Sequence, residues 1–178
     1  MVDLAEIQAA YYMVAATGVL VAASYYVLNM RAVIKAREFD ACKYLTTQMT
    51  SEQTMQSYSI LIGLEWKDYE DFMEKYGYSN HEIFAKWTSW FFLADTLGYT
   101  IRNQLVRAET IYDLGGYGFI RLWERYKEII QIRRDAAWGR DYFTSFEFLA
   151  KEMLRIKTSR DASFQGMLDA YRTTWKPF

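Results

Sequence analysis

The residue types that build metal sites and nucleophilic dyads are scarce in this chain. His81 is the only histidine and Cys42 the only cysteine among 178 residues. Zinc sites need several such ligands at short spacing, and a carboxylate-bridged di-iron bundle needs two Glu-x-x-His pairs. We therefore expect no metal and no cofactor. A Cys42–His81 dyad would have to form between distant positions, so we favour a solvated His81 and a Cys42 that is a small core residue or lies close to lipid.

Asp95 is the acid in the most unusual sequence setting. It follows the apolar run 90–94 and lies at the edge of an aromatic helix face, where an unpaired carboxylate is costly to desolvate. One interpretation is a general acid or base. We favour a structural role, either an ion pair with Arg102, two helical turns further on, or a bond to a neighbouring helix end. Other arginines that could pair with Asp95 are Arg121, Arg125 and Arg133.

Two further patterns resemble ligand sites, and both have simpler interpretations. The glycine-rich run 115–118 lacks the Gly-Lys-Ser/Thr ending and the preceding strand of a P-loop. We interpret it as a turn in which a glycine supplies a positive φ. Arg133 and Arg134 could join other arginines in an anion pocket. Because carboxylates are equally numerous, we favour a mixed, solvated surface.

A long apolar segment from Ala9 to Leu28 bears on the cellular location of all of these residues. Its twenty residues carry no formal charge. At about 1.5 Å per residue they form a helix as long as the apolar core of a bilayer is thick. Tyrosine pairs at 11–12 and 25–26 match the two interfacial belts of a membrane span. The alternatives are a buried core helix and a secretory signal peptide, although the latter would begin with basic residues. Val21-Ala22-Ala23 would be its cleavage site.

The charges on either side of this segment indicate its orientation. Asp3 and Glu6 precede it, and four cations follow it: Arg31, Lys35, Arg37 and Lys43. Because positive charge is retained on the cytoplasmic side, we expect the N-terminus outside and the rest of the chain in the cytoplasm. Within the span, Ala15, Gly18 and Ala22 share one face and would let another helix approach closely. Contact of this face with lipid alone is the open alternative.

The remaining chain predicts an all-α fold. Residues 1–30 form the N-terminal segment and transmembrane helix, which continues without a glycine or proline to Met49. Residues 31–157 form a cytoplasmic helical domain, and residues 158–178 a tail with weak periodicity. Sustained period-two alternation is absent, so we expect no sheet. Capping-box patterns at 50–53, 79–82 and 144–147 predict three helix starts, with Thr50, Ser79 and Thr144 as the N-caps.

Apolar residues also predict the packed faces of these helices. The longest face steps by three and four residues, as a packed helix seam does. It consists of Phe84, Trp87, Phe91, Ala94, Gly98, Ile101 and Leu105. A second stripe runs from Phe119 to Ile130, and a third includes Leu149, Met153 and Ile156. A helix from Lys67 to Tyr76 is expected to end at Gly77.

This arrangement resembles a family of short, membrane-anchored, mostly helical prokaryotic proteins catalogued as a domain of unknown function. The motifs that carry the resemblance are residues 66–72, 75–77, 97–98, 122–124 and 146–149. It extends over nearly the whole chain and implies an anchored helical architecture. It attaches no reaction, and it implies no catalytic or ligand-binding residues.

Composition narrows the function further. Lys and Arg number 21 and Asp and Glu 22, so the basic surplus of a nucleic-acid-binding protein is missing. We expect a non-enzymatic, single-pass membrane protein that is a scaffold or interaction module at the cytoplasmic membrane face. Its partners would be the lipid bilayer and either itself or a membrane-protein complex. One alternative is an accessory subunit of a larger integral-membrane enzyme or transporter. Another is a small hydrolase or nucleotide binder that uses Asp95 and the arginines.

Overall fold

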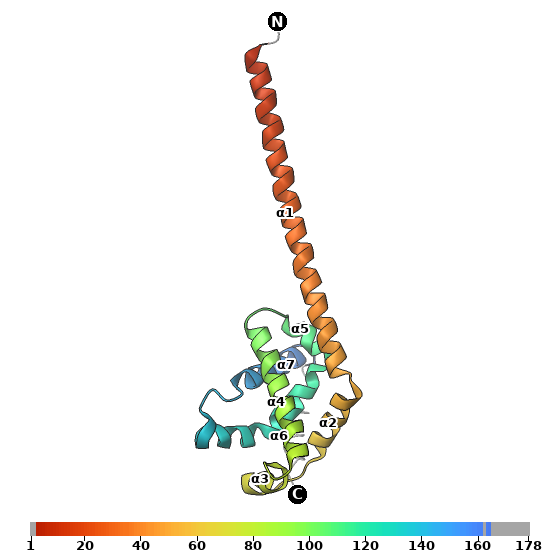
Figure 1. The fold of residues 1–178 in the computed structure, drawn as a ribbon, viewed down its shortest axis with the longest axis vertical. Coiled ribbons are helices and arrows are strands. Elements are labelled where there is room, and N and C mark those ends of the chain that lie inside the picture. Colours follow the sequence, from red (N-terminus) through yellow and green to blue (C-terminus); the bar gives the residue numbers. More distant parts are fainter. Residues whose placement is uncertain (1–2, 162, 165–178) are drawn as a thin grey trace. The chain divides into compact units, whose positions relative to one another are not determined.

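The described part of the chain is all-α. The computed structural model describes residues 3–161, 163 and 164, and within them it contains helices and no strand (Figure 1). The α-helices are α1 (Leu4–Met49), α2 (Glu52–Gly63), α3 (Tyr69–Tyr76), α4 (His81–Arg102), α5 (Ala108–Ile111), α6 (Tyr117–Arg133) and α7 (Thr144–Arg160). Two π-helical turns, Tyr112–Gly116 and Arg134–Trp138, follow α5 and α6, and the first is kinked at Gly115, whose backbone is not helical. The prediction of an all-α fold is confirmed.

The chain divides into two units, Met1–Lys43 and Tyr44–Phe178, which we describe separately. The first unit is most of α1, a single helix of 46 residues. Its most apolar 18-residue window has a mean hydropathy of 1.5, and none of that window is buried. Helix α1 is therefore long and apolar enough to cross a membrane. The apolar run ends near residue 30, but the helix does not. It continues to Met49, as the sequence predicts.

The second unit has an aromatic core built by four helices. Phe91 of α4 lies at its centre, with ring centroids 5.1 Å from Tyr126 of α6 and 5.6 Å from Phe146 of α7. Trp87 lies 5.3 Å from Phe91 and 5.8 Å from Phe72 of α3. All five side chains are buried. Tilted and edge-to-face pairs of this kind contribute about 0.5–1.5 kcal/mol each beyond the area that they bury.

Buried polar atoms of two of these rings connect the core to backbone carbonyls. The hydroxyl of Tyr126 donates to the carbonyl oxygen of Leu61 at 2.7 Å, and Nε1 of Trp87 donates to that of Tyr76 at 2.9 Å. Burial raises the pKa of the Tyr126 hydroxyl, so it remains a proton donor. These bonds connect α6 to α2 and α4 to α3, and they satisfy polar groups that would otherwise be costly to bury.

Two predicted helix starts are correct in place but wrong in the capping residue. The N-cap of α2 is Ser51, whose oxygen accepts from the backbone nitrogen of Thr54, and not Thr50. The N-cap of α4 is Asn80, which accepts from the nitrogen of Ile83, and not Ser79. The hydroxyls of the two predicted caps donate backwards, to the carbonyl oxygens of Thr46 and Glu74, and so belong to the preceding helix.

The predicted packed face of α4 is correct in its central part. Trp87, Phe91, Ala94 and Gly98 are buried. Phe84 and Ile101 are half-buried, and Leu105 is 61% exposed. The helix ends at Arg102, and Gln104 has a positive φ of 56°, which turns the chain away from the helical path. The stripes of α6 and α7 are buried as predicted, except that Trp123 of α6 is half-buried. Residues 158–160, assigned to the tail, belong to α7, and 165–178 lie outside the described residues.

At Gly98 the backbone of α4 lies close to the start of α7. A Cβ atom at this position would lie 1.8 Å from the carbonyl oxygen of Ser145, which is backbone and cannot rotate away. The glycine is required for the space that it leaves and not for its φ, which is not positive. A side chain here would have to push the start of α7 off α4.

We predict that Gly98→Ala destabilises the second unit by about 2–4 kcal/mol, because backbone must move to admit one methyl group. Thermal unfolding of the full chain in detergent, followed by far-UV circular dichroism, should show a Tm about 5–15 °C lower. Gly63→Ala is the matched control, since a Cβ there meets nothing within 4 Å and the residue is helical. Equal Tm values for the two variants would contradict the close approach.

Candidate functional site

Helix α7 begins without a cap of its own. The residue before it, Phe143, has a left-handed backbone (φ 54°) and makes no side-chain capping bond. The predicted reciprocal capping box of Thr144 and Glu147 does not form, because Glu147 instead accepts from Arg134 and Lys151, both at 2.7 Å. The first turn of α7 therefore needs hydrogen-bond partners from another part of the chain.

Asp95 of α4 supplies the missing cap. Its Oδ1 accepts from the backbone nitrogen of Phe146, the third residue of α7, at 2.9 Å. An N-cap side chain of the helix itself would bond the same N–H, so Asp95 is a cap supplied from another helix. The carboxylate also carries the charge that a helix N-terminus favours. A bond to a neighbouring helix end, one of the two structural roles expected of Asp95, is present.

Arg102 contacts the same turn and does not pair with Asp95. Its NH2 group donates to the carbonyl oxygen of Thr144 at 3.2 Å, and its guanidinium lies 4.9 Å from the ring centroid of Phe148. No ion pair joins Asp95 to Arg102 in the described structure. Asp95 instead bonds the backbone of α7, so the prediction of an Asp95–Arg102 pair is wrong. Asp95, Gly98 and Arg102 instead form one face of α4 that holds the start of α7.

Arg134, the second of the tandem arginines, holds the segment that leads into α7. Arg134 donates to the carbonyl oxygens of Tyr142 at 2.7 Å and Phe143 at 3.1 Å, and its NH1 pairs with Glu147. Burial raises the pKa of Glu147, but the hydrogen bonds from Lys151 and Arg134 more than offset this and leave the pKa below its usual value. The carboxylate thus stays charged as an anchor for Arg134.

Arg133 departs from the solvated surface expected of it. Its side chain is 3% exposed, donates to the hydroxyl of Tyr78 at 3.3 Å and lies over the ring of Trp87 at 5.2 Å. Aromatic faces and a hydroxyl replace part of the water that the guanidinium loses on burial. The two adjacent arginines therefore serve packing and loop anchoring, and they do not converge on one pocket.

A cavity with a volume of about 500 Å³ lies in the described part of the second unit. Its walls come from the last residue of α1, from α2, α4 and α6, and from the π turn before α6. The lining residues are Met49, Thr50, Met55, Tyr58, Trp90, Leu114, Gly115, Tyr117, Gly118, Phe119 and Arg121. This volume is in the range of small-molecule sites, and the lining combines apolar and aromatic walls with few polar groups.

The glycine run that the sequence marks as a turn forms part of this cavity. Gly115 has a φ of 112°, so the interpretation as a turn with a positive φ is confirmed. Gly115 and Gly118 both line the cavity, where they leave backbone without side chains. Between them, Gly116 faces α7, because a Cβ there would meet Sδ of Met153 at 2.4 Å. The sequence identifies the turn, but the walls that complete the cavity lie far away in the chain.

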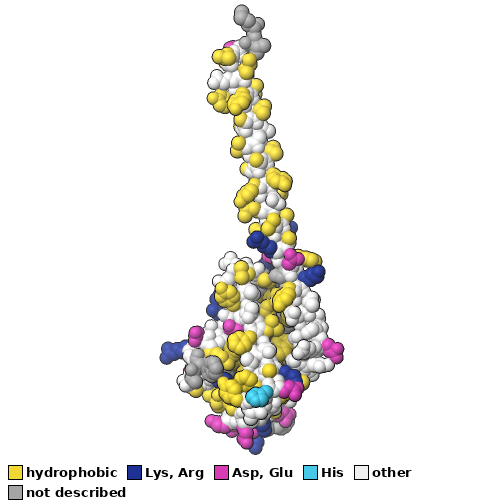
Figure 2. Space-filling view, viewed as in Figure 1, with side chains coloured by type: hydrophobic (Ala, Val, Ile, Leu, Met, Phe, Trp, Pro, Cys, Tyr) yellow, Lys and Arg dark blue, Asp and Glu magenta, His cyan; other side chains and the backbone are white. Residues whose placement is uncertain are grey.

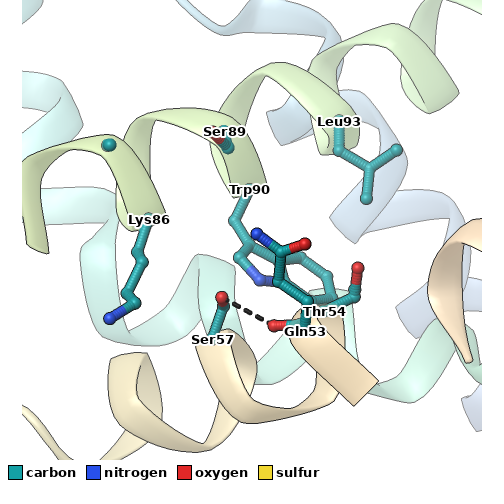
Figure 3. Close-up of a pocket in the computed structure, with 8 residues that line it drawn as sticks. Gln53, Thr54, Ser57, Lys86, Ser89, Trp90 and Leu93 are labelled. Carbon is teal, nitrogen blue, oxygen red and sulfur yellow. Dashed lines mark hydrogen bonds between the residues drawn. The ribbon is translucent and has the colours of Figure 1, made fainter. Parts of the chain in front are cut away.

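A smaller and more polar pocket of about 220 Å³ lies between α2 and α4 (Figure 3). It is lined by Gln53, Thr54, Ser57, Ala85, Lys86, Ser89, Trp90 and Leu93. Lys86 is paired with Glu82, and the Ser57 hydroxyl donates to the carbonyl oxygen of Gln53 at 2.8 Å. The lining residues include hydroxyl groups but neither a histidine nor a carboxylate that could act as their base. Trp90 separates this pocket from the larger cavity and lines both.

The other predicted site residues lie outside these pockets. His81 is the exposed first residue of α4, and Cys42 is half-buried near the end of α1. Within the described residues, no group of three or more His, Cys, Asp or Glu side chains could hold a metal ion. Ala15, Gly18 and Ala22 are exposed on α1, and a Cβ at Gly18 would meet nothing within 4 Å. Helix packing through these three residues stays a prediction.

Comparisons with known proteins add no relative: no family model, no curated protein and no solved structure matches the chain. The resemblance to a family of membrane-anchored helical proteins therefore stays a prediction.

We predict that Asp95→Ala lowers the free energy of unfolding by about 0.5–2 kcal/mol, the usual cost of losing a helix cap. Asp95→Asn keeps an acceptor oxygen and should cost no more than a few tenths of a kcal/mol. Thr144→Ala should also be nearly neutral, although the sequence pattern makes Thr144 the cap. Urea unfolding of the three variants tests this order. A larger loss for Thr144→Ala than for Asp95→Ala would show that α7 is capped locally.

Proposed function

We propose that the chain is a single-pass membrane protein whose helical domain acts as a scaffold or interaction module at the cytoplasmic face. The observation that carries the proposal is the apolar segment of α1, none of whose most apolar window is buried. A core helix of a soluble protein would have this surface covered by its own chain. An uncovered apolar helix about as long as a bilayer is thick fits lipid as its solvent.

The ends of the segment support both the span and its direction. Tyr11, Tyr12, Tyr25 and Tyr26 are all exposed, as the amphipathic rings of interfacial belts are. Figure 2 shows apolar side chains along α1 and basic side chains toward its C-terminal part, where the sequence places Arg31, Lys35, Arg37 and Lys43. The positive-inside rule then favours an external N-terminus and a cytoplasmic second unit.

The second unit supports binding over catalysis. Its most unusual acid, Asp95, is used as a helix cap, and Arg134 is used to anchor a loop. In contrast, several large apolar side chains stay uncovered on its surface. Phe92 is 59% exposed and Tyr99 56%, seven residues apart on α4. Exposed aromatic residues are typical anchors of protein interfaces.

The second candidate is an accessory subunit of a larger integral-membrane complex, favoured by the small face of α1. In lipid, helices associate through close packing, and Ala15, Gly18 and Ala22 would permit it. Self-association through the same face would make the module an oligomer. Both versions place the contact within the span.

The orientation can be tested with single-cysteine variants in a Cys42→Ser background. Gln8→Cys and Ser59→Cys place thiols at exposed positions before and after the span. A membrane-impermeant maleimide should label Gln8→Cys in intact cells, and Ser59→Cys only after permeabilisation. The reverse pattern would overturn the orientation. Recovery of the chain without detergent would overturn the span, and a mature protein that starts at Ser24 would identify a cleaved signal peptide.

The small face can be tested with Gly18→Leu. Because a side chain at Gly18 meets nothing within the chain, the change should leave the fold intact while blocking close helix approach. We expect loss of a chemically crosslinked oligomer, or release of a larger partner, during size-exclusion chromatography in mild detergent. Leu20→Ile, which keeps the side-chain volume, is the control. An intact assembly in the Gly18→Leu variant would show that this face contacts lipid and does not mediate association.

A further inference from the structure

The cavity of about 500 Å³ has a lining that is apolar over most of its extent and charged at one residue. Four aromatic side chains and two methionines contribute to its walls: Tyr58, Trp90, Tyr117, Phe119, Met49 and Met55. Methionine is flexible and adapts to ligands of irregular shape. Among the described lining residues, Arg121 is the only charged one. Apolar walls with one cation suit a ligand that has an apolar body and a single anionic group.

Glycines in the wall make room for such a ligand. A Cβ atom added at Gly115 would have Cε of Met49 as its nearest neighbour, at 3.9 Å, and one added at Gly118 would have the Tyr58 hydroxyl oxygen, at 3.4 Å. At both positions the nearest atoms belong to side chains, whereas at Gly98 they belong to the backbone. The space beside them is therefore open to a ligand, with flexible or aromatic side chains as its limits.

We propose that this cavity binds a single-chain amphiphile with an anionic head, with the acyl chain against the aromatic wall and the head at Arg121. Long-chain carboxylates are the simplest members of this class. The proposal rests on the proposed function for the supply of ligand, because a chain anchored in a bilayer meets amphiphiles at high local concentration. The cations that follow the span, Arg31, Lys35 and Arg37, would attract anionic ones.

The test uses the full chain in nanodiscs of dioleoylphosphatidylcholine with a photoactivatable probe, a palmitate analogue that carries a diazirine in its chain. Tryptic peptides separate the two environments. Residues 1–31 contain the span, whereas 44–67 and 108–121 contain most of the cavity wall. We expect adducts in all three peptides. Excess oleate should remove those in 44–67 and 108–121, and excess oleyl alcohol, which lacks the charge, should not.

Variants test the charge and the space separately. Arg121→Gln, from which trypsin releases residues 108–125 in place of 108–121, should reduce the cavity adducts by roughly tenfold, the loss expected for a hydrogen bond to a charged group. Arg121→Lys should restore part of them. Lys127→Gln removes a cation from the same helix outside the cavity and should change nothing. Gly118→Leu should fill the cavity and remove its adducts, with the fold checked by circular dichroism.

Each result has one meaning. Adducts confined to residues 1–31 would overturn the proposal and leave the cavity to a polypeptide segment, either of this chain or of a partner. Equal competition by oleyl alcohol, or full labelling of Arg121→Gln, would overturn the anionic head. Cavity adducts without any in residues 1–31, from a protein that does not associate with the bilayer, would support the cavity site and contradict the membrane anchor.

Discussion

The approach of α4 to α7 at Gly98 is the constraint on which most of the second unit depends. The backbones come so close that no side chain fits between them, and this fixes where along α4 the first turn of α7 lies. Asp95 and Arg102, one turn before and after Gly98, then reach the N–H and C=O groups of that turn. With the two helices held in this register, Phe91 and Phe146 meet in the core.

This arrangement uses polar groups sparingly and inside the structure. A carboxylate replaces a missing cap, an arginine anchors the loop before α7, and a tyrosine hydroxyl connects α6 to α2. Each bond satisfies a backbone group that burial would otherwise leave unpaired. These residues are of the types that catalytic sites use, and in the described structure their printed contacts are with backbone groups of the fold.

The sequence predicts the helices better than it predicts their ends. Periodicity identifies the buried faces of α4, α6 and α7 because it depends on neighbours three and four residues away. Caps depend on which carbonyl or N–H a hydroxyl meets first, and Thr50 and Ser79 meet carbonyls of the preceding helix. The cap of α7 comes from Asp95, fifty-one residues before Phe146, so no local pattern could reveal it. The cavity is lined by five separate segments of the chain, so its existence depends on tertiary packing that the sequence pattern does not reveal.

The two units solve opposite solvation problems. The second unit covers its aromatic residues with its own helices, whereas α1 leaves twenty uncharged residues uncovered. No hydrophobic gain within the described chain offsets that exposure, whereas the bilayer of the proposed function would offset it. The proposed amphiphile site beside Trp90 poses a similar problem on a smaller scale, because its walls are mostly apolar. In this proposal the membrane would both surround the apolar part of α1 and supply ligands to the cavity, so the proposed anchor and the proposed binding site would depend on the same apolar molecules.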